Sequence, residues 1–476
     1  MRSITSIKYD INNVPIKLKV RNVIDGSEQG HVSDNYSHVL ISSSMRMLAA
    51  VAVHLGLILK QADYETAYLN SVSRNRNIFV RMPDDLMAAL GTTKRYARLH
   101  KTVYGLKQAS AEWYNHLSNW LKSKQFVPIK SDPCVFKAPD SLGTCFIGIS
   151  TDDLMIAVDT EDHYRSLLEL LNTDHVVKDL GNLEWYLGIA FHQDLVAGTV
   201  TLDQAKYIET LALEYKVTQS RAVRTVLPVE LPTVADSPST PQQHRDARAR
   251  PYLQCLGAIN FVATNTRPDI AMAVSYLGSF SQCHGLKHWD ALMHLLRYLY
   301  FTREEKLTYR YQDDVTNANV MSVYTDSGYA SCDPLQERGQ YSGYVSMLNG
   351  AAIDWKARRV GATLSTTEAE YIALCLGGRE ACHGKQKLKE LGFEATSPTV
   401  IYSDNNAAIT IAKSKAVTQL NKHFDIQLHW IRNKVADNWF DVQRCDTSIQ
   451  PADIFTKNLP VATLAKHRHT VLGLNH

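Results

Sequence analysis

Two adjacent aspartates between two apolar runs constrain the fold of this chain more than any other feature. Residues 145–150 and 154–158 are mostly apolar, and Thr151, Asp152 and Asp153 lie between them. Two short apolar runs separated by turn residues predict a β-hairpin, with both carboxylates at its tip. Like charges flanked by buried strands repel each other and lose hydration, so they must either be exposed or share a divalent cation. The hairpin alone leaves both interpretations open.

A third aspartate, Asp63, ends a separate apolar run far upstream of the hairpin. Mg²⁺ prefers hard oxygen ligands and keeps open positions for phosphate. Carboxylates at two strand ends therefore suit a two-Mg²⁺ phosphoryl-transfer site, with ions about 4 Å apart on the attacking and departing oxygens. Two other Asp-Asp pairs, at 84–85 and 313–314, have polar neighbours and are predicted to be solvated loops.

A second acidic set lies in the last third of the chain. Asp326 and Asp404 each end a strand-like run, Glu368 opens a helical stretch, and Asp453 lies in QPADIFTK. These acids could converge at one sheet edge and form a second two-metal site. Taken singly, Glu368 could favour the positive end of a helix, and Asp404 could cap the next one. Glu370 faces away from Glu368 on a helix, so we predict that it is solvated.

Changes in composition divide the chain into segments. Residues 221–250 are rich in Pro, Ser, Thr and charged residues, which predicts a linker. In residues 1–220, strand-like runs alternate with amphipathic helical patterns, and residues 251–318 are predicted to be a helical connection. Residues 319–460 indicate a separate α/β domain, followed by a C-terminal tail at 461–476. The predicted fold class is a multidomain protein of mixed α+β and α/β architecture.

Composition excludes several classes of protein. With 45% hydrophobic and 21% charged residues, the chain is neither disordered nor fibrous. The net charge of +3 does not by itself indicate nucleic acid, and the eight cysteines lack metal-site spacing. The longest apolar stretch is shorter than the roughly 20 residues that cross a bilayer, and no secretory signal is visible. We therefore expect an intracellular protein that does not enter a membrane.

Five runs, in order, resemble the reverse transcriptase of copia-type LTR retrotransposons. They are QADYETAYLN at 61–70, LHKTVYGLKQ at 99–108, SDPCVF at 131–136, DDLMIAV at 152–158 and KDLGNLEWYLGI at 178–189. The resemblance continues through TRPDIA at 266–271 into the C-terminal domain, so it covers nearly the whole chain. It implies a right-hand polymerase palm with truncated fingers and thumb, a helical connection and a ribonuclease H-like domain. Asp63, Asp152 and Asp153 would bind the two Mg²⁺ ions of the palm.

Three further residues match nucleotide-binding positions of that family. Tyr68 matches the bulky gate that clashes with a ribonucleotide 2′-OH, with a core tyrosine as the alternative. Gln108 matches a residue that contacts the incoming nucleotide, with a loop glutamine that caps backbone groups as the alternative. Arg21 matches the fingers arginine that grips the triphosphate, because a guanidinium suits phosphate geometry; a solvated arginine is the alternative.

The C-terminal acids resemble the copia-type ribonuclease H quartet, which maps onto Asp326, Glu368, Asp404 and Asp453. The resemblance therefore implies an RNA-directed DNA polymerase with ribonuclease H activity, and each site would hold two Mg²⁺ ions or Mn²⁺ in their place. Its partners would be an RNA template, a DNA primer, an RNA/DNA hybrid and dNTPs. We expect it in the cytoplasm, inside or outside virus-like particles, or in the nucleus.

Two departures from the family pattern bear on the polymerase. The family has Tyr-Val-Asp-Asp where this chain has Ser150-Thr151-Asp152-Asp153, so the ligands remain while their packing support changes. The resemblance also begins only near residue 15, whereas the family has a longer fingers region. Both features suit an alternative, a catalytically degenerate retroelement relic that binds nucleic acid or acts as an assembly partner, with only the ribonuclease H site active.

Such a protein must hold a hybrid by its backbone and shape, because the deep A-like groove hides the base sequence. Basic residues near aromatic ones suit this role, and the alternative is a solvated surface. The candidates are Arg95, Arg98, Lys101, Lys122 and Lys124 near Tyr96, Trp113 and Trp120, and Lys356, Arg358 and Arg359 beside Trp355. Trp113 and Trp120 also lie on one face of a helix predicted over 110–126, which favours a core position. His423 and His429 lack the spacing of a zinc pair on a helix.

Overall fold

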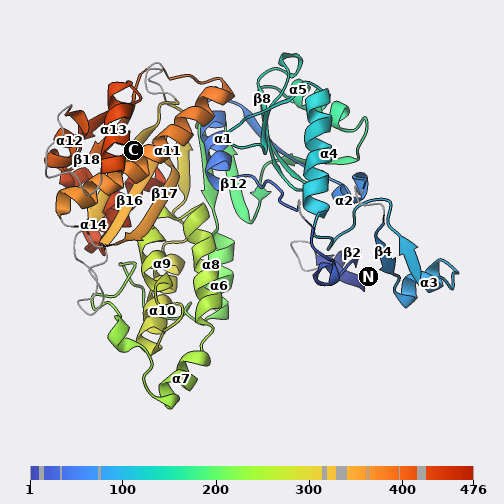
Figure 1. Ribbon diagram of the computed structural model, residues 1–476, viewed down its shortest axis with the longest axis horizontal. Helices are drawn as coiled ribbons and strands as arrows, with labels where there is room; N and C mark the ends of the chain where they lie inside the picture. Colours follow the sequence, from blue (N-terminus) through green and yellow to red (C-terminus); the bar gives the residue numbers. More distant parts are fainter. Residues whose placement is uncertain are drawn as a thin grey trace. The chain divides into compact units, whose positions relative to one another are not determined.

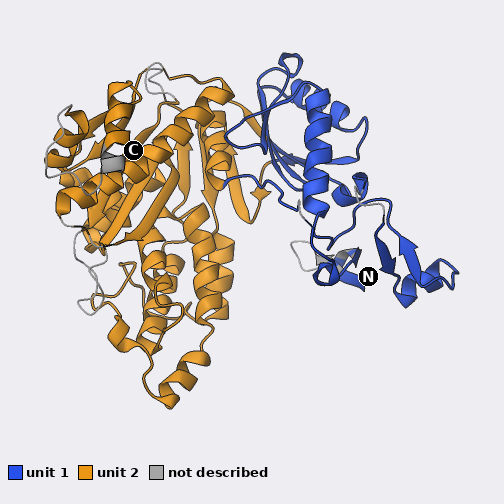
Figure 2. Cartoon of the chain, in the orientation of Figure 1, with its two compact units in different colours: residues 1–41, 60–182 blue, residues 42–59, 183–476 orange. Residues whose placement is uncertain are grey.

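The computed structural model describes residues 2–9, 15–32, 35–72, 77–312, 319–328, 340–361, 363, 365–395, 397–414 and 425–474. The chain forms two compact units (Figure 2). Unit 1 consists of Met1–Ile41 and Lys60–Asn182, and unit 2 consists of Ser42–Leu59 and Leu183–His476. No helix in the described ranges is long and apolar enough to cross a membrane.

A six-stranded sheet forms the centre of unit 1, in the order β10-β3-β9-β8-β7-β6 (Figure 1). Its strands are β3 (Ile58–Tyr64), β6 (Val127–Pro128), β7 (Val135–Lys137), β8 (Cys145–Ser150), β9 (Asp153–Val158) and β10 (Val177–Asn182). The predicted hairpin is confirmed, since β8 pairs with β9 and Ser150 lies opposite Asp153. Thr151 in the tight turn has a left-handed backbone, with φ at 56°.

Helices α4 (Ala109–Ser123) and α5 (Glu161–Leu171) complete the core of this unit. The predicted apolar stripe on α4 is confirmed at Trp113, Leu117 and Leu121, which are each 1% exposed, whereas Trp120 is only half-buried. The Trp113 ring meets the ring of Tyr64 on β3, with centroids 5.4 Å apart. Burial of these large side chains fixes α4 against the strand that carries Asp63.

Two small two-stranded sheets and two short helices make up the rest of unit 1. The sheets pair β1 (Arg2–Tyr9) with β2 (Pro15–Val23) and β4 (Phe79–Arg81) with β5 (Tyr96–Arg98), and the helices are α2 (Ala67–Asn70) and α3 (Asp84–Ala89). Asp84 and Asp85 are exposed as predicted, but they open helix α3 rather than a loop. The pair at 313–314 lies outside the described residues.

The first part of unit 2 combines a four-stranded sheet with helices. The sheet order is β11-β12-β13-β14. Its strands are β11 (Trp185–Tyr186), β12 (Ile189–Asp194), β13 (Thr199–Asp203) and β14 (Leu307–Arg310), and the helices are α1 (Ser42–Leu55), α6 (Ala205–Glu214), α7 (Pro241–Arg248), α8 (Tyr252–Asn265), α9 (Ala271–Gly278) and α10 (Leu286–Phe301). The segment 221–250, predicted as a linker, contains α7 and belongs to this unit.

The TRPDIA run holds a buried ion pair in this helical part. The Arg267 guanidinium donates two hydrogen bonds to the Asp269 carboxylate, at 2.8 and 2.7 Å, and both residues are at most 2% exposed. Tyr298 on α10 donates to the same carboxylate at 2.8 Å. Burial opposes ionisation of Asp269, but the guanidinium outweighs it and lowers the pKa of Asp269. This motif is therefore explained by packing, since a buried charge is tolerated when it is paired and hydrogen-bonded.

The second part of unit 2 is a five-stranded sheet in the order β17-β16-β15-β18-β19. Strands β15, β16 and β17 are antiparallel, whereas β18 is parallel to both β15 and β19. This order and these directions are those of a ribonuclease H-like domain. The elements are β15 (Ser322–Gly328), β16 (Gln340–Leu348), β17 (Ala351–Val360), α11 (Thr366–Leu391), β18 (Thr399–Ser403), α12 (Asn406–Lys413), α13 (Asp425–Ala436), β19 (Phe440–Arg444), η7 (Pro451–Phe455) and α14 (Val461–Leu472).

Residues beyond 460 do not form the expected tail. They form α14, whose Leu464, His467, Val471 and Leu472 are at most 1% exposed. Their 3–4 residue spacing gives the helix an apolar face that packs onto the domain. The C-terminal helix is therefore part of the domain core.

Candidate active sites

The Asp152 hairpin is held through its backbone. The Tyr64 amide on β3 donates to the Asp152 carbonyl at 2.8 Å, and the Trp113 indole donates to the Thr151 carbonyl at 2.7 Å. Both carbonyls of the turn are thus fixed by neighbouring elements. Because Asp63 precedes Tyr64 on β3, which lies beside β9, the structure brings Asp63 next to the hairpin. The side chains of Asp63, Asp152 and Asp153 are all half-buried.

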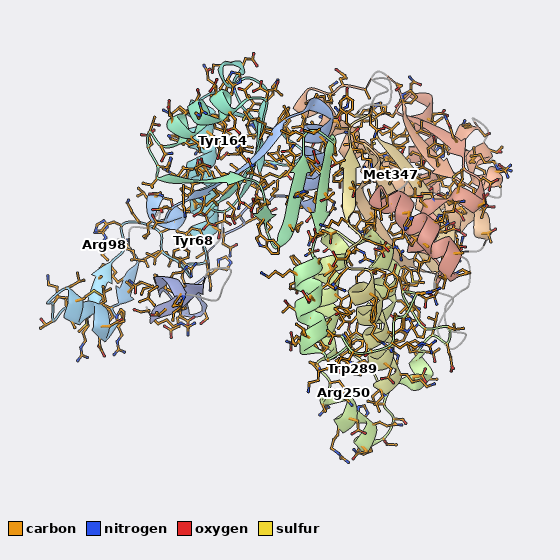
Figure 3. All side chains as sticks on the ribbon, turned by 180° about the vertical axis from the view of Figure 1, so that it is seen from behind. Tyr68, Arg98, Tyr164, Arg250, Trp289 and Met347 are labelled. Atoms are coloured by element: carbon orange, nitrogen blue, oxygen red, sulfur yellow. The ribbon has the colours of Figure 1, made fainter. Side chains whose placement is uncertain are left out.

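Tyr68 and Arg21 meet around a third residue, Tyr104. The Tyr68 ring, labelled in Figure 3, packs edge-on against the Tyr104 ring with centroids 4.8 Å apart, and its hydroxyl lies 3.0 Å from the Ser110 hydroxyl. The Arg21 guanidinium lies 5.9 Å from the centre of the Tyr104 ring. Burial raises the pKa of Tyr104, and the Asp152 carboxylate acts in the same direction. Tyr104 therefore contacts Arg21 through its ring and lies within the electrostatic influence of the Asp152 carboxylate.

Tyr104 was not among the predicted site residues, although it is the aromatic residue of the YGLKQ run. Gln108, which ends that run, is 4% exposed. It occupies the N-cap position of α4, but its side chain makes no capping hydrogen bond. Its side-chain oxygen instead accepts from the Gln29 amide at 2.7 Å. The Gln108 side chain thus does not cap α4. It is hydrogen-bonded instead to the segment that follows β2.

A separate acidic cluster lies near the carboxyl ends of the adjacent strands β15 and β18 of the ribonuclease H-like sheet. Oxygens of Asp326, Glu370 and Asp404 all lie within 4.8 Å of one another. Parallel pairing of Tyr324 with Tyr402 brings the two aspartates, each two residues further on, to the same level. Among the described residues this is the one group of three His, Cys, Asp or Glu side chains at that spacing. The oxygens of Asp63, Asp152 and Asp153 are therefore not all within 4.8 Å of one another.

The prediction that Glu370 is a solvated side chain is wrong. Glu370 is 8% exposed, and its Oε2 atom is buried without a hydrogen-bond partner among the described residues. Burial, reinforced by the Asp326 and Asp404 carboxylates, raises the pKa of Glu370 to about 9. Glu368, which was predicted to be the helix ligand, does not belong to the group of three. Its backbone amide donates to the Ser365 N-cap at 3.1 Å.

The periodicity of α11 explains why Glu370 and not Glu368 faces the sheet. The buried face of the helix includes Glu370, Leu374, Gly377 and Ala381. Residues 3–4 apart share a face, whereas residues two apart do not. A Cβ atom at Gly377 would lie 2.4 Å from the Thr325 methyl, so the helix approaches β15 closely at this point. This stripe was visible in the sequence and would have assigned Glu370 to the core.

The fourth acid, Asp453, is joined to Asp326 by Lys457. The Lys457 ammonium lies 2.8 Å from Asp453 Oδ1 and 3.3 Å from Asp326 Oδ2. The Thr456 hydroxyl donates to Asp326 as well. Burial raises the pKa values of Asp326 and Asp453, and in both cases Lys457 opposes the rise. Asp326 thus belongs to the group of three and also pairs with Lys457.

Two glycines let η7 lie against the sheet beside Asp326. Gly343 on β16 is directly opposite Asp326, and a Cβ atom there would lie 2.4 Å from Phe455 Cβ. A Cβ atom at Gly328 would lie 2.7 Å from the Thr456 carbonyl oxygen. Real Cβ atoms essentially never come so close, so larger residues would push η7, and Asp453 with it, away from Asp326.

The expected basic and aromatic surfaces are only partly formed. Trp355 is 8% exposed, and its indole donates to the Ala263 carbonyl at 2.8 Å, so it does not belong to a surface with the exposed Lys356, Arg358 and Arg359. Trp113 is also buried. Arg95, Tyr96 and Arg98 (the last labelled in Figure 3) are exposed around β5. His429 is exposed, and His423 lies outside the described residues.

Comparisons with known proteins identify the class. A family model described as reverse transcriptase (RNA-dependent DNA polymerase) matches residues 4–230. The chain is 31% identical over 460 residues to the Pol polyprotein of the Nicotiana tabacum transposon TNT 1-94, which covers 95% of this chain and 34% of that protein. It is 28% identical over 467 residues to the Pol polyprotein of transposon RE1 from Arabidopsis thaliana, covering 96% and 30%. A Ty5-1 transposon protein of Saccharomyces cerevisiae is 30% identical over 312 residues, which is 65% of this chain and 97% of that protein.

This chain is therefore a retroelement reverse transcriptase-type protein. More narrowly, it belongs to the copia-type retrotransposon Pol family, as its motifs predicted. It spans about a third of the length of the two plant polyproteins that it matches.

Solved structures also align with the chain. The foamy viral protease-reverse transcriptase in complex with RNA/DNA hybrid aligns with a TM-score of 0.46 at 12% identity, covering 93% of this chain and 50% of that one. LC11-RNase H1 in complex with RNA/DNA hybrid aligns with a TM-score of 0.23 at 15% identity, covering 29% of this chain and 93% of that one.

Proposed function

We propose that this chain cleaves the RNA strand of an RNA/DNA hybrid at the Asp326, Glu370 and Asp404 cluster. The observation that carries this proposal is the buried, unpartnered Oε2 atom of Glu370, within 4.8 Å of two further carboxylates. A buried carboxylate oxygen that accepts no hydrogen bond is costly unless the group is neutralised or holds a cation. Hard oxygen donors with hydroxyl and backbone neighbours fit a divalent ion such as Mg²⁺. Glu370 replaces Glu368 in this proposal.

In this mechanism the side chains of the cluster hold and orient the reacting groups. A bound divalent ion would lower the pKa of the attacking water and stabilise charge on the phosphate. Asp326 and Asp404, on adjacent parallel strands, define the sheet side of the site, and Glu370 closes it from α11. Thr447 donates to Asp404 at 3.0 Å and restricts the rotation of that carboxylate. The hybrid would be held by its backbone and shape.

The proposal extends to the palm of unit 1 as an RNA-directed DNA polymerase site. Asp63, Asp152 and Asp153 would hold divalent ions that bring a primer 3′-OH to the α-phosphate of a dNTP. Tyr68, packed on Tyr104, would exclude a ribonucleotide 2′-OH. Arg21 and Gln108 would contact the incoming nucleotide. Family membership and the contact of β3 with the hairpin turn support this assignment.

The sequence-based domain limits are kept as part of this proposal. Reverse transcriptase-like fingers, palm and thumb would occupy 1–220, and the helical connection 251–318. The ribonuclease H-like domain would occupy 319–460 together with helix α14, which replaces the predicted tail, and the cluster of acids lies inside it. An RNA template, a DNA primer and dNTPs would be the further partners of the polymerase half.

A second candidate is a relic whose nuclease site alone is active. It is favoured by Ser150, which stands before Thr151 and the two aspartates where the family pattern has an aromatic residue. In this candidate the palm would bind nucleic acid or a partner protein without extending a primer.

One assay of the purified chain separates the two candidates. The chain is incubated with Mg²⁺, dNTPs and a primed RNA template, and primer extension and hybrid cleavage are followed together. We expect both activities, with Asp152→Asn abolishing extension alone and Asp404→Asn abolishing cleavage alone. Cleavage without extension would support the relic. Cleavage that persists at the parent rate in Asp404→Asn would contradict the proposed nuclease site.

A further inference from the structure

Lys457 places a fixed positive charge among the four acids of the nuclease domain. It lies four residues after Asp453, and its backbone amide donates to the Asp453 carbonyl at 3.0 Å. Its ammonium contacts Asp453 Oδ1 at 2.8 Å and both Asp326 oxygens, at 3.4 and 3.3 Å. The lysine side chain is 36% exposed, whereas the two carboxylates are at most 8% exposed. The ammonium therefore reaches the buried acids from the solvent side.

These contacts involve the oxygens that a second divalent ion would need. Two-metal sites hold their ions about 3.5–4 Å apart, bridged by a shared carboxylate. In this chain the shared carboxylate would be Asp326, with Glu370 and Asp404 on one side and Asp453 on the other. On the Asp453 side the ammonium already lies within ion-pair distance of both aspartates. An ammonium and a divalent cation cannot both occupy that position, because they repel each other and require the same lone pairs.

The surrounding packing holds this arrangement in place. Thr456 donates both to the Asp326 carboxylate and, at 3.2 Å, to the Asp453 carbonyl. Gly328 and Gly343 let this segment lie directly on the sheet, where larger residues would collide with it. Lys457 is thus positioned by its chain neighbours as well as by the acids.

We propose that Lys457 takes the place of the second metal ion, so that the nuclease site binds a single divalent cation on Asp326, Glu370 and Asp404. This inference rests on the proposed nuclease function. Asp453 is then a positioning residue for Lys457 rather than a metal ligand. An ammonium has three N–H donors. Two serve Asp326 and Asp453, and the third is directed to an oxygen of the scissile phosphate.

The test counts bound ions in the presence of substrate, because phosphate oxygens complete such sites. The full chain is saturated with a non-cleavable 2′-O-methyl RNA/DNA hybrid, and bound Mn²⁺ is counted by electron paramagnetic resonance. The number of Mn²⁺ ions bound to the Asp326→Asn variant is then subtracted from the number bound to the parent. Ions held by the hybrid and by the palm are present in both counts, so they cancel. We expect a difference of one ion for the parent. A difference of two overturns the inference, and a difference of zero contradicts the proposed metal site itself.

Variants of Lys457 sharpen the result. Lys457→Met removes the charge at nearly constant volume. We expect this variant to bind two more Mn²⁺ ions than the double variant Lys457→Met/Asp326→Asn. Lys457→Arg keeps the charge and should retain one ion. Lys389→Met is the matched control, because this exposed lysine of the same domain pairs with Glu394 and not with the cluster. A Lys457→Met protein that still binds one ion would show that the lysine does not exclude the second. If Lys457→Met does not fold, the parent count alone decides.

Discussion

The two acidic sites of this chain are built in opposite ways. In the palm, Asp63, Asp152 and Asp153 are half-buried, and the hairpin that carries two of them is fixed by hydrogen bonds to its carbonyls. In the ribonuclease H-like domain, Asp326, Asp453 and Glu370 are 1%, 6% and 8% exposed. Three of its acids come within 4.8 Å, and the fourth is tied to them by Lys457.

This difference shows two solutions to the repulsion between carboxylates. Solvent can screen the repulsion between acids at an exposed turn, so in the palm a stiff backbone is enough to keep the metal-free carboxylates in position. Buried acids have raised pKa values and require a cation, either a metal ion or an ammonium. The nuclease site should therefore depend more strongly on packing and on pH than the palm site does.

Among changes that alter only packing or a single hydrogen bond, the largest expected effect comes from Gly343→Ala. The added methyl collides with Phe455 and displaces η7, which carries Asp453, while unit 1 is untouched. We expect hybrid cleavage to fall about tenfold or more, because relieving such overpacking typically costs 1–3 kcal/mol. Primer extension should stay at the parent rate. Gly257→Ala on α8 is the control, since nothing lies within 4 Å of the added atom. Equal losses in both activities would contradict the comparison.

The next effect is on the pH dependence of stability. Burial and two neighbouring carboxylates raise the pKa of Glu370 from 4.5 to about 9, so the metal-free folded chain keeps a proton that the unfolded chain loses above pH 4.5. The contribution of Glu370 to stability is thus fully present below that pH and is lost as pH rises towards 9, by up to about 1.4 kcal/mol per pH unit.

Urea unfolding in EDTA at pH 6, 7 and 8 measures this slope. Glu370→Gln carries no titrating proton, so the free energy of unfolding should change less with pH than in the parent. Identical slopes would mean that Glu370 ionises normally in the folded chain.

The smallest effect is expected in the palm, from Trp113→Phe. This change removes the hydrogen bond to the Thr151 carbonyl but keeps an aromatic ring in the core. A single hydrogen bond contributes about 1 kcal/mol, so extension should fall about fivefold, with cleavage unchanged. Trp120→Phe, on the same helix, removes only an indole bond to Asp174 and serves as the control. If both variants extend equally well, the hairpin does not need this support.

Much of the fold could be predicted from local pattern. The hairpin at Asp152, the apolar stripe of α4 and the α/β character of the C-terminal domain all follow from runs and periods that are read along the chain. Copia-type membership followed from motif order. The helix α14 was missed because the basic run Lys466, His467 and Arg468 separates its apolar residues along the sequence, and composition alone assigns such a run to a solvated tail.

The nuclease site could be predicted only in part. The strand aspartates, Asp326 and Asp404, were identified because acids at strand ends meet at a sheet edge. Glu370 was missed because the choice between two glutamates two residues apart was made without the stripe of α11 that Glu370 shares with Leu374 and Ala381. The spacing of Lys457 and Asp453 is visible in the sequence, but the contact of Lys457 with Asp326 is not, because Asp326 is distant in sequence and meets it only through tertiary packing.

Hybrid cleavage by Glu370→Gln compared with Glu368→Gln tests the central claim most directly. Both variants replace one carboxylate by an amide of nearly the same size on the same turn of α11. With Mg²⁺ and an RNA/DNA hybrid, Glu370→Gln should cleave at least about 100-fold more slowly than the parent, as expected for loss of a metal ligand. Glu368→Gln should stay within about twofold of the parent, as is usual for side chains outside a site. A slow Glu368→Gln beside a fully active Glu370→Gln would contradict the account.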